Sequence, residues 1–241
     1  MKKFTTLATL FTAISILVGA TAHAADTYTF EPLGFSKDGK YYAYGTHTTS
    51  DGSGYPVAFA AVIEVATGKT VASKFVHLEV DKATESDALK ASIKAVALGG
   101  FGIIARRHPG MDRLERLPSD DSAYTSTVFT SDTTPVNHRS HELVLEETPA
   151  STTSATWCQN ETRKVKLTLK TSDRAGAAIS SVLVDEQSMP TERACAWNHS
   201  IRRVTTFGDS LVVVVGYVSW GFEGLNRQFT VFTANSSQVS H

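Results

Sequence analysis

The sequence predicts a mainly β protein of antiparallel meanders, propeller-like or sandwich-like, with one short helix near residues 85–98. Three observations support this fold class. Residues 163–171 alternate strictly, with Val165, Leu167 and Leu169 on one face, as in a strand with one buried side. Apolar runs of strand length are separated by turns rich in glycine and aspartate. Helical spacing of apolar residues is clear in a single segment.

The first predicted unit is a hairpin in the stretch GFSKDGKYYAYGTH, residues 34–47. Its Lys-Asp-Gly turn reverses the chain, because aspartate supplies a side-chain acceptor and glycine tolerates positive φ. Apolar strands at 57–65 and 71–80 bring this unit to the size of one propeller blade. The strand–Asp-Gly–strand signature occurs clearly once, so the sequence favours propeller-like meanders over a regular propeller.

The predicted helix follows directly. Its apolar residues at helical spacing are Leu89, Ile93 and Val96. Thr84 and Asp87 match a capping box, and the glycine pair 99–100 is a natural stop. The polar stretch 106–124 contains two prolines and is predicted to be an irregular crossover.

The remaining chain is predicted to be β again. The expected strands are 126–132, 141–150, 163–171, 178–186, 211–218 and 228–234. The strongest of them is 211–218, which contains four consecutive valines. Residues 25–235 are predicted to form a single mainly β domain, and the polar residues 236–241 a disordered tail.

The N-terminus has the pattern of a secretory signal peptide over residues 1–24. Two lysines precede an uncharged, mostly apolar stretch, and small residues at Ala22 and Ala24 predict cleavage near Ala24. The alternative, an uncleaved membrane anchor, is disfavoured because the apolar stretch is too short to span a bilayer comfortably. The expected location is therefore periplasmic or secreted, with no membrane span after cleavage.

Cysteine usage agrees with export. The chain has two cysteines, Cys158 and Cys195, which are expected to pair as a disulfide in an oxidising compartment. The alternatives are a redox pair or metal ligands, but the sequence has no CxxC motif and no histidine at ligand spacing from either cysteine. We expect no metal site and no cofactor.

The charge balance argues against a nucleic-acid partner. The chain has 23 basic and 24 acidic residues, for a formal net charge of −1. Binding to the phosphate backbone needs a sustained basic field, which is missing here. The arginine-rich stretch at 106–116 also contains Asp112 and Glu115, so local neutralisation is the expected role of its charges.

Three segments together resemble a bacterial family of predicted secreted proteins, domain of unknown function 2259. They read GFSKDGKYYAYGTHTTSDGSGYPVAFAAVIEVATG, VDEQSMPTERACAWNHSIRRV and LVVVVGYVSWGFEGLNRQFTVFTA. The family pattern often has proline after the second glycine of the closing GFEG motif, where this chain has Leu225. The resemblance implies an exported protein and brings no activity, substrate or catalytic residues.

The segment SWGFEGLNR, residues 219–227, is the candidate ligand-contact loop. It is longer than a hairpin needs, and it holds Trp220, Phe222, Glu223 and Arg227. Aromatic side chains offer stacking area, and glutamate and arginine offer polar orientation. The alternative is that the aromatic side chains are buried in the core while Glu223 pairs with Arg227.

These features favour a non-catalytic binding module that contacts an unknown protein or small molecule in the cell envelope. No GxSxG motif is present, and both cysteines are expected to be consumed in a disulfide. The alternative is a periplasmic hydrolase that uses carboxylates near Glu223, with Asp185 or Glu186 as a partner. A third hypothesis is a purely structural domain without a concave site.

Overall fold

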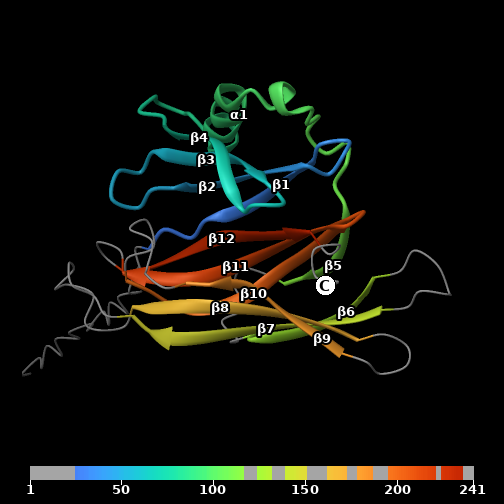
Figure 1. The fold of residues 1–241 in the computed structure, drawn as a ribbon. Coiled ribbons are helices and arrows are strands. Elements are labelled where there is room, and N and C mark those ends of the chain that lie inside the picture. The colour runs from blue at the N-terminus through green and yellow to red at the C-terminus, as the bar shows by residue number, and fades with distance from the viewer. Residues whose placement is uncertain are drawn as a thin grey trace, which may run out of the picture.

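Three four-stranded antiparallel sheets stack in layers, and one α-helix covers the outermost sheet (Figure 1). The structure is a computed structural model and describes residues 25–116, 124–131, 139–150, 162–172, 178–186, 195–220 and 224–235. The predicted signal peptide and the predicted tail lie outside these residues. The mainly β prediction with one short helix is confirmed, whereas the propeller-like alternative is not confirmed.

The first sheet is a simple meander of β1 to β4. Its strands are β1 Thr29–Phe35, β2 Tyr41–Thr49, β3 Pro56–Glu64 and β4 Lys69–His77. The predicted Asp-Gly turn joins β1 to β2, where Asp38 accepts hydrogen bonds from the Ser36 hydroxyl at 2.6 Å and the Lys40 amide at 3.1 Å. Gly39 has a φ of +72°, which is the conformation that favours glycine at this turn.

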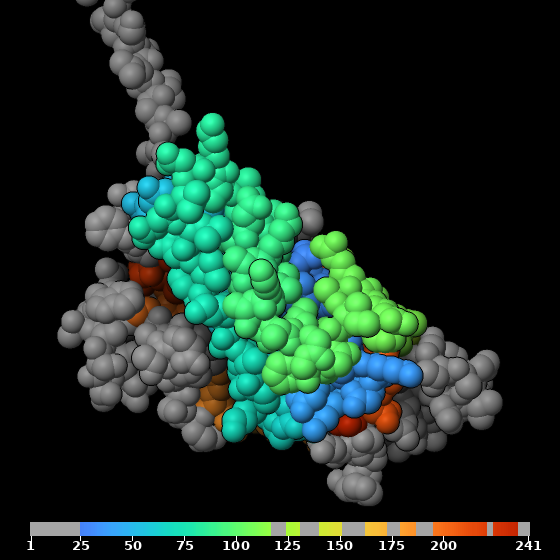
Figure 2. Space-filling model, turned by 90° about the horizontal axis from the view of Figure 1, so that it is seen from above, coloured from blue at the N-terminus to red at the C-terminus, as the bar shows by residue number. Residues whose placement is uncertain are grey.

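Helix α1 spans Glu85–Val96 and packs on the outer face of the first sheet (Figure 2). The predicted capping box is confirmed, since the Thr84 hydroxyl accepts from the Asp87 amide and Asp87 accepts from the Thr84 amide. The helix ends earlier than its glycine pair predicts, because Ala97 adopts a left-handed conformation with φ of 56°. A short 3₁₀ turn, η1 Leu98–Phe101, follows.

The middle sheet has the order β12-β11-β10-β5. Its strands are β5 Met111–Glu115, β10 Ala196–Phe207, β11 Ser210–Trp220 and β12 Leu225–Asn235. The prediction that 106–124 is an irregular crossover is wrong for β5, which pairs with β10. Short strands with charged residues give little apolar alternation, so this edge strand has no clear sequence signal.

The valine run on β11 is explained by burial on both faces. Val212 and Val214 pack toward the first sheet with Phe35 and Tyr42, while Val213 packs toward the third sheet. Alternate side chains of a strand point to opposite faces, so a strand between two sheets must be apolar at nearly every position.

The third sheet is formed by β6 to β9 in sequence order. Its strands are β6 Ser126–Ser131, β7 Arg139–Pro149, β8 Arg163–Ser172 and β9 Ala178–Asp185. The predicted alternation of β8 is confirmed, because Val165, Leu167 and Leu169 are all buried against the middle sheet. The layers are thus held together by apolar side chains that interdigitate between faces.

Candidate functional site

The hairpin between β11 and β12 is tighter than the sequence predicts. Trp220 pairs with Leu225 in the ladder, and Val218 pairs with Arg227. The connection is therefore residues 221–224, which is an ordinary hairpin length. The expectation of a long loop over 219–227 is wrong, because the ends of that segment continue the two strands.

The structure brings Trp220 and Arg227 to the same face of the middle sheet. Arg227 lies opposite Val218, and Trp220 is two residues further along β11, so all three side chains leave the sheet on one side. Phe222 and Glu223 lie outside the described residues. The assignment of these four residues to a ligand-contact surface stays a prediction.

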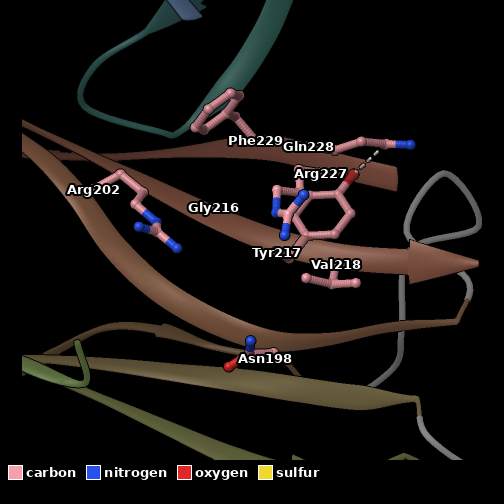
Figure 3. A pocket seen from close by; sticks show the side chains of 8 residues that line it. All are labelled: Asn198, Arg202, Gly216, Tyr217, Val218, Arg227, Gln228 and Phe229. Carbon is pink, nitrogen blue, oxygen red and sulfur yellow. Dashed lines mark hydrogen bonds between the residues drawn. The ribbon is translucent and has the colours of Figure 1, made fainter. Parts of the chain in front are cut away.

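A cleft lies next to Arg227 (Figure 3). Its volume is about 290 Å³, open solvent included. Three strands contribute the residues that line it, which are Asn198, Arg202, Gly216, Tyr217, Val218, Arg227, Gln228 and Phe229. Among the residues that the structure describes, two of the lining side chains are guanidinium groups and two are amides. The described lining is therefore rich in groups that can donate hydrogen bonds.

Two β-bulges in β10 supply the lining residues of that strand. Between Trp197 and Ser200, and again between Ile201 and Arg203, β10 has one residue more than β11. Asn198 lies in the first bulge with φ of 51°, a left-handed conformation that asparagine adopts more readily than most residues. Bulges redirect side chains and are frequent next to functional sites.

Arg202 is the extra residue of the second bulge and is 9% exposed. It lies across the backbone of β11, where Gly216 makes room for it. A Cβ at position 216 would come within 2.9 Å of Arg202 Cγ and 3.0 Å of its Nε. Glycine at this position therefore allows the close approach that positions the guanidinium at the cleft.

Aromatic side chains lie beside this cleft on the same end of the sheet. The rings of Trp197 and Trp220 are 5.4 Å apart and tilted by 43°. The Trp220 indole Nε1 is buried and has no hydrogen-bond acceptor among the residues that the structure describes.

On the opposite face of the middle sheet, a buried histidine–glutamate pair joins two layers. His199 of β10 is fully buried, and its Nδ1 lies 2.6 Å from Glu147 Oε1 on β7. The same carboxylate oxygen accepts a hydrogen bond of 2.8 Å from the His199 amide. Burial raises the pKa of Glu147, but the hydrogen bonds from His199 outweigh burial and hold that pKa below its ordinary value.

The sequence analysis missed the His199–Glu147 pair. The two residues are 52 positions apart in the chain, so no local spacing connects them. A pair on two different sheets becomes visible once the packing of β7 against β10 is known. The one sequence feature that could have pointed to this pair is the isolated histidine at position 199.

The arginines of segment 106–116 make separate local contacts. Arg106 pairs with Glu31, and Arg113 donates to the Thr206 hydroxyl at 3.0 Å. Asp112 and Glu115 instead accept hydrogen bonds from Arg203 of the middle sheet. The prediction that Asp112 and Glu115 neutralise the arginines of their own segment is therefore wrong, because both carboxylates pair with Arg203 of β10.

The carboxylates proposed for hydrolysis are not brought together by any described contact. Glu186 Oε2 accepts a hydrogen bond of 2.9 Å from the Val165 amide, and Asp185 lies opposite Lys166 in the third sheet. Glu223 lies outside the described residues, so the hydrolase hypothesis stays a prediction. Within the described ranges, no three side chains of His, Cys, Asp or Glu cluster as a metal site would require.

None of the described helices of this chain has the length and apolar character needed to cross a lipid bilayer.

Comparisons with known proteins place the chain in a family. No curated protein matches the sequence. The family model DUF2259, described as predicted secreted protein, matches residues 43–235. This match covers most of the chain, including β2 to β12, and the family resemblance of the three sequence segments is confirmed: the chain belongs to the DUF2259 family of predicted secreted proteins.

Proposed function

We propose that this protein is exported to the periplasm and acts there as a non-catalytic binding module. Its contact surface is the end of the middle sheet that holds the cleft, Trp220 and Arg227. The observation that carries the proposal is the cleft, where two bulges and a glycine bring Asn198 and Arg202 into the lining. Bulges and left-handed residues within a strand are more frequent next to functional sites than in regular sheet.

The family description supports export, and the N-terminal pattern supports cleavage near Ala24. Residues 25–235 then form one mainly β domain. Residues 26–28 lie along β12, which supports a domain that begins at the predicted cleavage site. There the Arg227 amide donates to the Asp26 carbonyl at 2.9 Å, and the Tyr28 amide donates to the Arg227 carbonyl at 3.1 Å.

The proposed disulfide belongs to the same picture of an exported chain. Cys195 is fully buried directly before β10, while Cys158 lies outside the described residues. We expect intact mass spectrometry of the periplasmic protein under non-reducing conditions to show a chain that begins at Ala25 and lacks two hydrogens. Peptide mapping should then recover the Cys158–Cys195 cross-link. Two alkylated thiols would contradict the disulfide. An N-terminus that retains Lys2 and Lys3 would contradict cleavage and export.

The binding proposal is tested by affinity capture from periplasmic extract. The double variant Trp220→Ala with Arg227→Ala should lose partners that the wild-type protein captures, because both side chains lie on the proposed surface. The matched control is the double variant Val128→Ala with Val182→Ala, which truncates two exposed side chains on the third sheet. The control variant should capture the wild-type set.

Two outcomes of this capture would count against the proposal. If the Trp220 and Arg227 variant captures the same partners as wild type, the contact surface is elsewhere. If the captured partner is released in a cleaved form, as judged by its mass, the protein is catalytic and the carboxylates near Glu223 become the first candidates. Recovery of the partner at unchanged mass supports a binding role.

A further inference from the structure

The chain contains two Asp-Gly pairs, and the fold treats them differently. Asp38 and Gly39 lie in the turn between β1 and β2, whereas Asp51 and Gly52 lie in the turn between β2 and β3. At an Asp-Gly pair the backbone readily attacks the aspartate side chain, because glycine has no Cβ to hinder the approach of its amide nitrogen. The surroundings of each pair decide how fast this reaction runs.

The reaction needs no reagent other than water. The glycine amide nitrogen attacks the protonated carboxyl carbon of the aspartate, so a C–N bond forms. The carboxyl hydroxyl and the amide proton leave together as water, and the product is a cyclic succinimide. Water then adds to one of the two ring carbonyl carbons and breaks its C–N bond. Opening at the backbone carbonyl gives isoaspartate, whose main chain is longer by one methylene group.

Both reacting groups of the β2–β3 turn are accessible. Residues 51–54 are exposed, and a Cβ added at Gly52 or Gly54 would meet no atom within 4 Å. Among the residues that the structure describes, neither the Asp51 carboxylate nor the Gly52 amide has a hydrogen-bond partner. The carboxyl carbon and the amide nitrogen can therefore approach each other without the loss of a contact.

The same two groups are held apart in the β1–β2 turn. Asp38 Oδ1 accepts hydrogen bonds from the Ser36 hydroxyl at 2.6 Å and the Lys40 amide at 3.1 Å. These bonds lower the pKa of Asp38, which keeps its carboxyl group ionised and less open to attack. Gly39 is buried, and its amide donates to the Ser36 carbonyl at 3.0 Å while its carbonyl accepts from the Ser210 hydroxyl at 2.9 Å.

We propose that the Asp51–Gly52 pair is a site of spontaneous isoaspartate formation in the folded protein, and that the fold protects the Asp38–Gly39 pair from the same reaction. The inference goes beyond the proposed binding function and does not depend on it. The expected ratio of the two rates is about tenfold or more, because attack at Asp38 must first break hydrogen bonds that Asp51 lacks.

The modification would change a contact between the first sheet and the start of the mature chain. The Asp51 amide donates to Asp26 Oδ1 at 2.8 Å, and the Asp26 carbonyl accepts from the Arg227 amide at 2.9 Å. A longer main chain at Asp51 displaces its amide from that carboxylate. Isoaspartate formation therefore loosens the β2–β3 turn from residues 26–28, which lie beside the proposed contact surface.

The test follows the full exported protein during long incubation in neutral buffer made with H₂¹⁸O. Each opening of a succinimide by water leaves one ¹⁸O atom at that aspartate, so peptide masses record the reaction. Trypsin releases residues 41–69, where Asp51 is the sole aspartate, and chymotrypsin releases residues 36–41, where Asp38 is the sole aspartate. Electron-transfer fragmentation then distinguishes isoaspartate from aspartate. We expect label to enter at Asp51 about tenfold faster than at Asp38, or more.

A variant and a solvent change separate the fold from the local sequence. Gly52→Ala should slow labelling at Asp51, since its methyl group hinders the attacking nitrogen while the open space at this position accommodates it. Ser53→Ala is the matched control in the same turn and should keep the wild-type rate. In urea the two aspartates should react at similar rates, because unfolding removes the hydrogen bonds that protect Asp38.

Three results would overturn the proposal. Equal labelling of Asp38 and Asp51 in the folded protein would show that the β1–β2 turn gives no protection. Label that enters at Asp51 in urea but not in the folded protein would show that the β2–β3 turn keeps the two groups apart. A rate difference that persists in urea would assign it to neighbouring residues instead of the fold. Each of these results leaves the binding function untouched, since no partner takes part.

Discussion

Replacing Leu167 by alanine is expected to lower the free energy of unfolding by about 2–5 kcal/mol. Leu167 is fully buried on β8 and belongs to the apolar cluster between the third and middle sheets. Removing its branched end leaves a cavity between two rigid layers, which cannot collapse to fill it. Urea unfolding followed by circular dichroism, with the midpoint and slope compared to wild type, measures this change.

The matched control is the neighbouring residue on the same strand. Lys166→Ala truncates a side chain on the other face of β8, so its effect should stay within about 0.5 kcal/mol. Equal destabilisation by both variants would show that the face assignment of β8 is wrong. It would also argue against the stacking of the third sheet on the middle sheet.

The second large effect is expected at the buried pair between β7 and β10. Glu147→Ala should lower the free energy of unfolding by about 3 kcal/mol, because it leaves the buried His199 ring and amide without their acceptor. Glu147→Gln should lower the free energy of unfolding by less, since the amide oxygen of glutamine can still accept a hydrogen bond. Thermal and urea unfolding of both variants at pH 7 measures the difference.

The contribution of Glu147 should also depend on pH. Its pKa is lower in the folded protein than in the unfolded chain, so the unfolded chain takes up the proton first as the pH falls. The stabilisation is therefore present above the ordinary carboxyl pKa and is lost as the pH falls through the folded value. The stability gap between wild type and Glu147→Gln should narrow in acid. A gap that stays constant from pH 7 to about pH 3 would contradict the lowered pKa.

Local sequence patterns predict most of the strands and the helix of this fold. The alternation at Val165, Leu167 and Leu169 predicts one buried face of β8, and the capping box at Thr84 predicts the start of α1. These patterns succeed because burial of one face and capping of one helix end are decided by residues close together in the chain.

The short edge strand and the hairpin length show where local patterns fail. β5 carries mixed charges because Asp112 and Glu115 bind Arg203 of β10, so its sequence looks like a solvated loop. The segment around Trp220 looks like a long loop because glycines interrupt it, yet both strands continue up to residues 220 and 225. In each case a partner strand supplies the hydrogen bonds that local propensity does not.

The sequence by itself determined the mainly β class, the helix, the strong strand at residues 211–218 and the membership of a secreted family. The tertiary structure alone decided the candidate site. Two bulges in β10 shift its side-chain alternation and direct Asn198 and Arg202 to the cleft, and Gly216 on another strand makes room for the arginine. The physical reason is that a bulge is set by the register between two strands, and register depends on packing across the whole sheet.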